Sequence, residues 1–152
     1  MRIAHLVVGV ALLLGACAHE VTPTVPAAPA ITTAGLLDTY WRLSELDGQQ
    51  VVTPADAREM HIVLGSANQR VSGFSGCNRL MGGYVLSGDT LKFDQVAGTM
   101  MACAPDMDLE KRFLALFPQV ARWEISGETL RWLDAGGKTL AAFQARRKPP
   151  SP

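Results

Sequence analysis

The stretch from residue 120 to residue 144, VARWEISGETLRWLDAGGKTLAAFQ, decides the fold class. Apolar and polar side chains alternate along Trp123-Glu124-Ile125 and along Leu130-Arg131-Trp132, as they do in strands that bury one face. Gly127 separates these two runs, and Gly136-Gly137 precedes a third run. Glycine at such positions is typical of hairpin turns. The stretch therefore predicts an antiparallel meander of three strands, at residues 120–126, 129–133 and 139–144.

Five more short strands are predicted upstream by the same criteria. Each is a run of β-forming residues that ends near turn signals such as Asp47-Gly48 and Ser87-Gly88-Asp89. The predicted ranges are 39–46, 60–64, 70–73, 83–85 and 90–93. Eight short strands in this arrangement predict a mainly β domain of the β-rich α+β class.

One segment, residues 105–117, has the period of a helix instead. Its apolar residues Leu109, Phe113, Leu116 and Phe117 recur at i, i+4, i+7 and i+8, which places them on one helix face. Pro105 suits the first turn of such a helix, and Pro118 would end it. We expect this helix to cover an open side or end of the sheet.

The N-terminus carries the features of an export signal. The basic start Met1-Arg2 precedes a nearly continuous apolar run from residue 3 to residue 14. About twelve residues span only about 18 Å as a helix, which is too short to cross a bilayer. The run ends in Leu14-Gly15-Ala16-Cys17, which resembles the bacterial lipoprotein box with Cys17 as the lipidation site. The alternative is an ordinary secretory signal with a chance cysteine.

These features divide the chain into four parts: a signal peptide at 1–16, a lipidated tether at 17–35, one domain at 36–145 and a basic tail at 146–152. Pro23, Pro26 and Pro29 bias the tether toward an extended conformation that forms no core. Ala18 stands where an inner-membrane retention signal would carry Asp. We therefore expect a bacterial envelope protein, anchored through its N-terminal lipid to the outer membrane and facing the periplasm.

The charge balance excludes several classes of partner and cofactor. The 14 basic and 14 acidic residues of the whole chain cancel, and residues 17–145 hold 10 bases and 14 acids, a net charge of −4. Nucleic-acid binding is not expected without a concentrated excess of Lys and Arg. Spacings typical of zinc, calcium and phosphate sites do not occur in the sequence. We therefore predict no cofactor, and a monomer.

Cys77 and Cys103 form an even pair once Cys17 is assigned to lipid. An exported protein folds in an oxidising compartment, which favours a disulfide between them over two free thiols. Closing a loop of about 27 residues would stabilise the domain by about 3.5 kcal/mol on the chain-entropy model. The bridge would join the Gly-rich turn at residues 75–78 to the start of the predicted helix.

Several motifs together resemble the META domain of the HslJ-like family of heat-shock-associated envelope proteins. They are Ser72-Gly73-Phe74-Ser75-Gly76-Cys77-Asn78-Arg79, Gly82-Gly83-Tyr84, Thr99-Met100-Met101-Ala102-Cys103, and Glu110 with Phe113-Leu114. Trp41-Arg42-Leu43 and Leu130-Arg131-Trp132-Leu133 match the family's opening and closing strands. The resemblance implies a compact, antiparallel β-barrel-like sheet with one helix, and it implies no established catalytic activity.

A thiol enzyme is an alternative to the non-catalytic function that this resemblance implies. Cys77, His61 and Asn78 are of the types that serve as nucleophile, base and orienting group. His61, however, alternates with Met60 and Ile62, which predicts a solvent-facing strand position. Asn78 fits a supporting role in a turn, where it tolerates the left-handed conformation. Gly73, Gly76, Gly82 and Gly83 fit tight turns or close packing.

The sequence therefore predicts a protein without catalytic residues that acts as an envelope stress or integrity factor by binding an envelope protein or a cell-wall partner. A β-barrel that binds a small apolar ligand is the alternative. A thiol enzyme that uses Cys77 and His61 is a more remote one. Arg146, Arg147 and Lys148 in the tail could touch anionic lipid, although three terminal bases usually serve only solubility.

Overall fold

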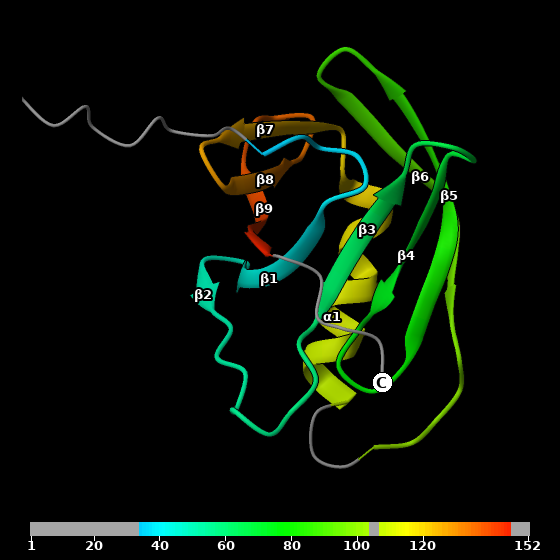
Figure 1. Ribbon diagram of the computed structural model, residues 1–152, viewed down its shortest axis with the longest axis vertical. Coiled ribbons are helices and arrows are strands. Elements are labelled where there is room, and N and C mark those ends of the chain that lie inside the picture. The colour runs from blue at the N-terminus through cyan, green and yellow to red at the C-terminus, as the bar shows by residue number, and fades with distance from the viewer. Residues whose placement is uncertain (1–33, 104–106, 147–152) are drawn as a thin grey trace, which may run out of the picture. The chain divides into compact units, whose positions relative to one another are not determined.

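The computed structural model describes residues 34–103 and 107–146 of the chain (Figure 1). These residues form nine strands, one α-helix and one short 3-10 turn. The strands are β1 (Tyr40–Leu46), β2 (Gln49–Gln50), β3 (His61–Gly65), β4 (Arg70–Phe74), β5 (Arg79–Ser87), β6 (Thr90–Gly98), β7 (Arg122–Ser126), β8 (Thr129–Leu133) and β9 (Thr139–Arg146). The helix α1 spans Met107–Leu116, and the turn η1 spans Phe117–Gln119.

All nine strands belong to a single antiparallel sheet, in the order β2-β1-β3-β4-β5-β6-β7-β8-β9. The first long strand also pairs with the last, from Tyr40 opposite Arg146 to Leu46 opposite Ala141, so the sheet closes into a ring. The seam between β6 and β7 is short, with Thr90 opposite Arg122 as its register pair. The predicted mainly β fold, with a closed antiparallel sheet and one helix among the described residues, is confirmed.

The inner face of the ring is filled by large side chains. The centre is Trp132 on β8, whose ring centroid lies 4.7 Å from that of Phe143, 4.8 Å from that of Phe93 and 5.1 Å from that of Phe117. Trp41 on β1 is fully buried, and its indole N–H donates to the carbonyl of Leu36 at 2.9 Å. The alternation predicted along the meander is present, because Leu130 and Trp132 are buried and Arg131 is exposed.

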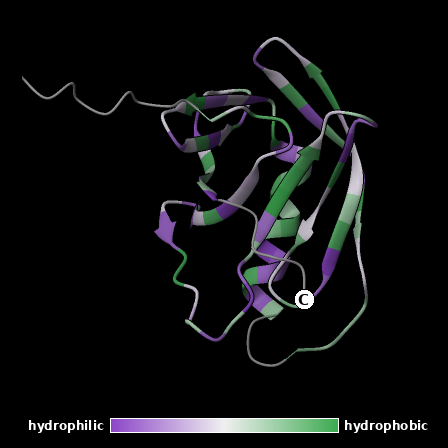
Figure 2. Cartoon of the chain, in the orientation of Figure 1, coloured by the Kyte–Doolittle hydropathy of each residue, from purple (hydrophilic) through white to green (hydrophobic). Residues whose placement is uncertain are grey.

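Helix α1 packs against this aromatic core through the predicted apolar face. Phe113, Leu116 and Phe117 are buried, and Figure 2 shows hydrophobic and hydrophilic residues both present along the helix. The α-helix ends at Leu116, and Pro118 lies in the 3-10 turn that follows, as expected of a residue that cannot continue a helix. The predicted start at Pro105 lies outside the described residues.

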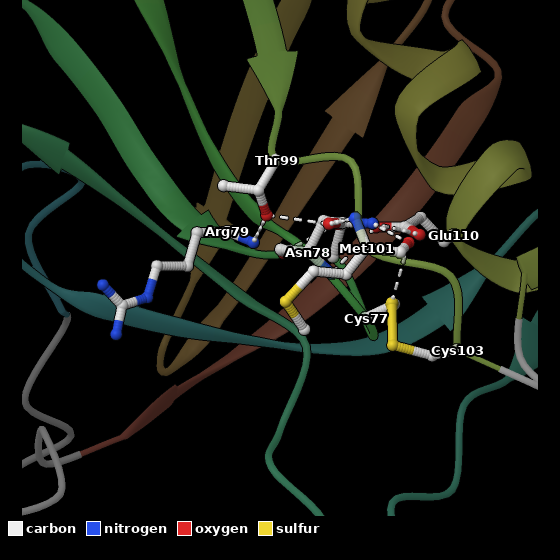
Figure 3. Close-up of a disulfide and its surroundings, with 8 residues drawn as sticks. Cys77, Asn78, Arg79, Thr99, Met101, Cys103 and Glu110 are labelled. Carbon is white, nitrogen blue, oxygen red and sulfur yellow. Dashed lines mark hydrogen bonds between the residues drawn. A yellow bond between two sulfur atoms is a disulfide. The ribbon is translucent and has the colours of Figure 1, made fainter.

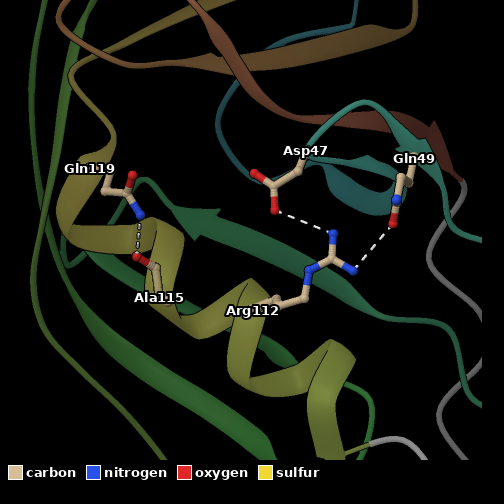
Figure 4. Close-up of polar contacts among 5 residues, drawn as sticks. All are labelled: Asp47, Gln49, Arg112, Ala115 and Gln119. Atoms are coloured by element: carbon tan, nitrogen blue, oxygen red, sulfur yellow. Dashed lines mark hydrogen bonds and ion pairs between the residues drawn. The ribbon is translucent and has the colours of Figure 1, made fainter.

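Polar contacts tie the exposed side of the helix to the first hairpin of the sheet. The Arg112 guanidinium donates to the Asp47 carboxylate at 3.4 Å and to the Gln49 side-chain oxygen at 3.3 Å (Figure 4). At the end of the helix, the Gln119 side chain donates to the carbonyl of Ala115 at 2.8 Å. These contacts are exposed, so each stabilises the fold only modestly, and the aromatic core holds the helix in place.

Two strands extend well beyond the predicted ranges. The prediction gave residues 83–85 and 90–93, whereas β5 and β6 each have nine residues and pair along most of their length. Gly82 and Gly83 were the source of the error, since they lie inside β5 at a bulge rather than at a turn. Of the two predicted roles for Gly82, a tight turn or close packing, close packing is the correct one. A Cβ at Gly82 would lie only 2.8 Å from the Val96 Cα. The two-residue strand β2 was not predicted.

Gly73 on β4 is required by the close approach of two backbones. A Cβ there would lie 2.0 Å from the carbonyl oxygen of His61 on the neighbouring strand. Gly83 also lies in a strand but has room for a side chain, so it is a matched control. Its Cβ would lie 3.6 Å from the nearest atom, the carbonyl oxygen of Asp94.

We therefore expect Gly73→Ala to lower the free energy of unfolding by about 1–3 kcal/mol, since the β3–β4 ladder must shift. Gly83→Ala should change it by less than about 1 kcal/mol. Urea denaturation followed by tryptophan fluorescence measures both. Equal effects of the two substitutions would contradict the assigned role of Gly73.

Candidate functional site

The turn between β4 and β5 carries the cysteine of the family motif. Cys77 and Cys103 are joined in a disulfide with a Cα–Cα distance of 5.7 Å. Gly76, with φ of 114°, adopts a backbone conformation that favours glycine, and the Ser75 N–H donates to the carbonyl of Asn78 at 2.8 Å to close the turn. The bridge thus ties this turn to the segment that precedes α1.

Glu110 on α1 lies beneath this turn and is only 3% exposed. Its carboxylate accepts hydrogen bonds from the Ser75 hydroxyl, from the Asn78 backbone N–H at 3.0 Å and from the Asn78 side-chain amide at 3.1 Å. Burying a carboxylate is costly unless hydrogen bonds compensate for lost water. These three donors provide that compensation and fix the helix against the turn.

Asn78 uses both ends of its side-chain amide in this cluster (Figure 3). The amide nitrogen donates to Glu110 and to the carbonyl of Met101, and the amide oxygen accepts from the Thr99 hydroxyl at 2.7 Å and the Met101 N–H at 2.8 Å. Asn78 does not have the left-handed backbone that was expected of it; Gly76 does. Its supporting role comes instead from bridging the turn to residues 99–101, which are distant in sequence.

In this arrangement, Cys77 and Asn78 are not available for the roles of nucleophile and orienting group that a thiol enzyme would need. The Cys77 sulfur is bonded to Cys103 in the structure, so it is not a thiol. The Asn78 amide is engaged with Glu110, Thr99 and Met101, so it does not orient an imidazole. Ser75, Cys77, Asn78 and Glu110 therefore form a structural cluster, which we call the turn cluster.

The prediction that His61 faces solvent is wrong. Met60 and Ile62 belong to the core and His61 does not, yet His61 is only 8% exposed. The Tyr40 ring stacks on the imidazole with a centroid distance of 4.2 Å, and Nδ1 lies 2.9 Å from the carbonyl oxygen of Glu59. Burial raises the pKa of Tyr40, so its hydroxyl stays protonated at neutral pH. The Tyr40 ring on the neighbouring strand covers His61. The alternation of residues within one strand does not predict such a contact between strands.

The outer face of β3, β4 and β5 is hollowed next to this stacked pair. A hollow of about 560 Å³ is lined by side chains that include Tyr40, His61, Met81 and Arg79, with Asp38 also on its wall. Hydrogen bonds from the side chain and the backbone N–H of Ser66 hold the pKa of the Asp38 carboxyl below its usual value, so Asp38 is ionised at neutral pH.

A second hollow of about 390 Å³ is lined by Arg58, Phe74, Cys77, Arg79, Thr99 and Met101. Arg58 and Arg79 line both hollows, so the two are adjacent and share a cationic wall. We call the two hollows together the outer groove. Cations, aromatic rings and exposed methionines line it.

The residues predicted from the family motif separate into two groups. Gly73, Gly76 and Asn78 serve packing and the turn cluster, whereas the Arg79 side chain lines the outer groove. Sequence reasoning missed Arg58 and Tyr40 as groove residues, and no motif marks them. Glu110 was predicted only as part of the family motif, although its place three residues before Phe113 on the apolar face signals a buried carboxylate.

The described residues hold neither a group of three potential metal ligands nor a helix long and apolar enough to span a membrane. Cys17, the predicted lipidation site, lies outside the described residues, as do the signal peptide, most of the tether and the end of the basic tail.

Removing the Glu110 carboxylate should destabilise the fold strongly. Glu110→Ala removes the acceptor shared by three buried donors: the Asn78 backbone N–H is left unpaired, and the Ser75 hydroxyl and the Asn78 amide each lose one of two hydrogen bonds. The expected cost is about 2–4 kcal/mol in the free energy of unfolding. Asp108→Ala is the matched control on the same helix, because that carboxylate is exposed and should contribute less than about 0.5 kcal/mol. Urea titrations of both variants test this, and similar midpoints would refute a structural role for the cluster.

The disulfide should be measurable both chemically and energetically. Mass spectrometry without reductant should find no alkylated Cys77 or Cys103, and Cys77→Ser combined with Cys103→Ser should cost about 3.5 kcal/mol on the chain-entropy model. Alkylation of Cys77 in the untreated protein would show that the bridge is not formed.

Comparisons with known proteins agree with this geometry. The model of the META domain family matches residues 34–147, which include every described strand and the helix. The chain is also similar to an NMR structure of a protein from Burkholderia xenovorans, with 27% identity, a TM-score of 0.61, and coverage of 84% of this chain and 100% of that one. No curated protein sequence matches the chain.

A second NMR structure shares the fold, with 23% identity, a TM-score of 0.57, and coverage of 72% of this chain and 90% of that one. The family is not a known catalytic one, which agrees with the structural use of Cys77 and Asn78 described above. On the match across residues 34–147, this chain belongs to the META domain family.

Proposed function

We propose that this META domain protein is a lipid-anchored, non-catalytic factor of the bacterial envelope that supports stress resistance or envelope integrity by binding a partner protein at the outer groove. The observation that carries the binding role is the groove itself, two adjacent hollows on an outer sheet face that share two arginines. The turn cluster, by contrast, is fully engaged in holding the fold.

The exposed methionines beside the groove support binding to a protein surface. Met81 is 55% exposed and Met101 is 58% exposed, although methionine is usually buried. Its flexible, polarisable side chain adapts to the shapes of partner side chains. Exposed apolar residues that border a hollow are typical of interaction surfaces.

The anchor is supported by the sequence Leu14-Gly15-Ala16-Cys17 after a short apolar run. Acyl chains on Cys17 would hold the protein at a membrane without any spanning helix. The eighteen residues from 18 to 35 would reach up to about 55 Å in an extended conformation, which is enough to present the domain to a partner away from the lipid surface.

A barrel that carries a small apolar ligand receives no support from the interior. Trp41, Leu43, Phe113, Trp132 and Phe143 are fully buried and occupy the space that such a ligand would need. The groove lies on the outer face and is open to solvent, so it suits a segment of another macromolecule better than an enclosed small molecule.

Crosslinking in bacterial cells tests the proposal. The full-length chain, with p-benzoylphenylalanine in place of Met81, should form a discrete protein adduct under ultraviolet light in cells labelled with an alkyne analogue of palmitate. The same probe in place of Arg131 is the control, because that exposed residue lies on β8, three strands from β5 around the ring. Label should appear on the chain and be lost with Cys17→Ser.

Adducts of equal yield at both positions, or at neither, would contradict binding at the groove. Label that persists on the Cys17→Ser chain would refute the assigned lipid site. The two readouts are separate, so an error in the anchor does not obscure the result for the groove.

A further inference from the structure

Two arginine side chains, those of Arg58 and Arg79, line the wall that both hollows share. The Arg58 Cζ lies 4.5 Å from the centroid of the Phe74 ring, so the cation stacks on that ring. Phe74 on β4 is the register partner of Arg79 on β5. Residues directly opposite in an antiparallel pair have Cβ atoms about 5 Å apart, so Arg79 is the cross-strand neighbour of the ring that Arg58 covers.

Neither guanidinium is neutralised by a carboxylate within the described parts of the chain. The ion pairs found there engage Arg42, Lys111 and Arg112 instead. Figure 3 shows the Arg79 side chain extending away from the turn cluster, although its backbone N–H donates to Thr99 at 3.3 Å. Two neighbouring like charges repel each other, and an anion placed beside both would relieve that repulsion.

Apolar side chains also line both hollows, which restricts the kind of anion. Phe74, Cys77 and Met101 line the smaller hollow, and Met81 and Tyr40 line the larger one. A ligand that fills both must bring apolar groups along with its negative charge. Arginine binds carboxylates through paired N–H donors, and the methionines accommodate varied apolar side chains.

A polyanion fits this surface poorly. Residues 17–145 carry a net charge of −4, and the ionised Asp38 lies on the wall of the larger hollow. A nucleic acid or a densely charged lipid surface would meet these negative charges along with the two arginines. A short peptide segment whose carboxylates contact only the two arginines would avoid these negative charges.

From these contacts we propose that the outer groove binds an acidic, apolar peptide segment of a partner protein, with its carboxylates on Arg58 and Arg79 and its apolar side chains against Phe74, Met81 and Met101. This inference rests on the proposed function, to which it adds the chemistry of the partner.

Fluorescence anisotropy with synthetic peptides tests it on the full-length chain in mild detergent. The probe is a fluorescein-labelled octapeptide that alternates Glu with Leu and Phe, and the comparison peptide has Gln at every Glu. The Glu peptide should bind at least tenfold more tightly than the Gln peptide, and raising the salt from 0.05 to 0.5 M should weaken its binding. Equal affinities, or no binding of the Glu peptide at 1 mM, would overturn the inference.

Variants identify the groups that hold the peptide. Arg58→Gln together with Arg79→Gln should weaken binding of the Glu peptide at least tenfold, and the corresponding Lys variants should weaken it less, because they keep the charge and lose the paired donors. Arg131→Gln is the matched control for net charge and should have no effect. An equal loss with Arg131→Gln, or no loss with the double variant, would contradict the assignment.

A phosphate ligand is a separate outcome of the same assay. Glycerol 1-phosphate, which carries the anion of a lipid headgroup, should not displace the peptide at 10 mM; displacement would reassign the wall to phosphate. If the peptide does not bind but Met81 forms adducts in cells, this inference is wrong and the proposed function stands. If the peptide binds but Met81 forms no adducts, the proposed binding of a partner in cells is contradicted and the peptide chemistry of the groove stands.

Discussion

The buried carboxylate of Glu110 is the group on which the arrangement of helix, turn and disulfide depends. It lies on the helix and accepts hydrogen bonds from Ser75 and Asn78 in the β4–β5 turn. The Asn78 amide oxygen in turn accepts hydrogen bonds from Thr99 and Met101, which are close in sequence to the disulfide partner Cys103. The helix, the β4–β5 turn and the segment at residues 99–103 are thus held together by side chains at one point.

A carboxylate in this position favours one arrangement over its alternatives more than it adds net stability. Removing it from water costs several kcal/mol, and its hydrogen bonds return that cost only when all donors are in place. An apolar residue at position 110 could pack against many nearby surfaces. Glu110 is satisfied only where the Ser75 and Asn78 donors converge, so it sets the rotation of α1 relative to the sheet and, through it, the placement of Phe113 and Phe117.

The sequence predicted those features that depend on local periodicity, and it failed where contacts across strands decide the outcome. The meander and the helix face follow from spacing along the chain, and the cysteine pairing follows from the even number left once Cys17 is assigned to lipid. The extent of β5 did not, because Gly82 and Gly83 are equally typical of a turn and of a bulge inside a strand. The burial of His61 depends on Tyr40, 21 positions away, and the groove depends on Arg58 in a loop that carries no motif.

The family motif joins these two kinds of feature, because Asn78 and Arg79 are adjacent and serve opposite sides of the chain. Asn78 is buried in the turn cluster, whereas Arg79 is exposed at the first position of β5. Asn78 directly precedes the first residue of β5, so whatever fixes the backbone at Asn78 also fixes the point from which the Arg79 side chain extends. The disulfide and Glu110 therefore position the cation of the outer groove without touching a ligand, and the same short motif can be needed both for the fold and for what the fold binds.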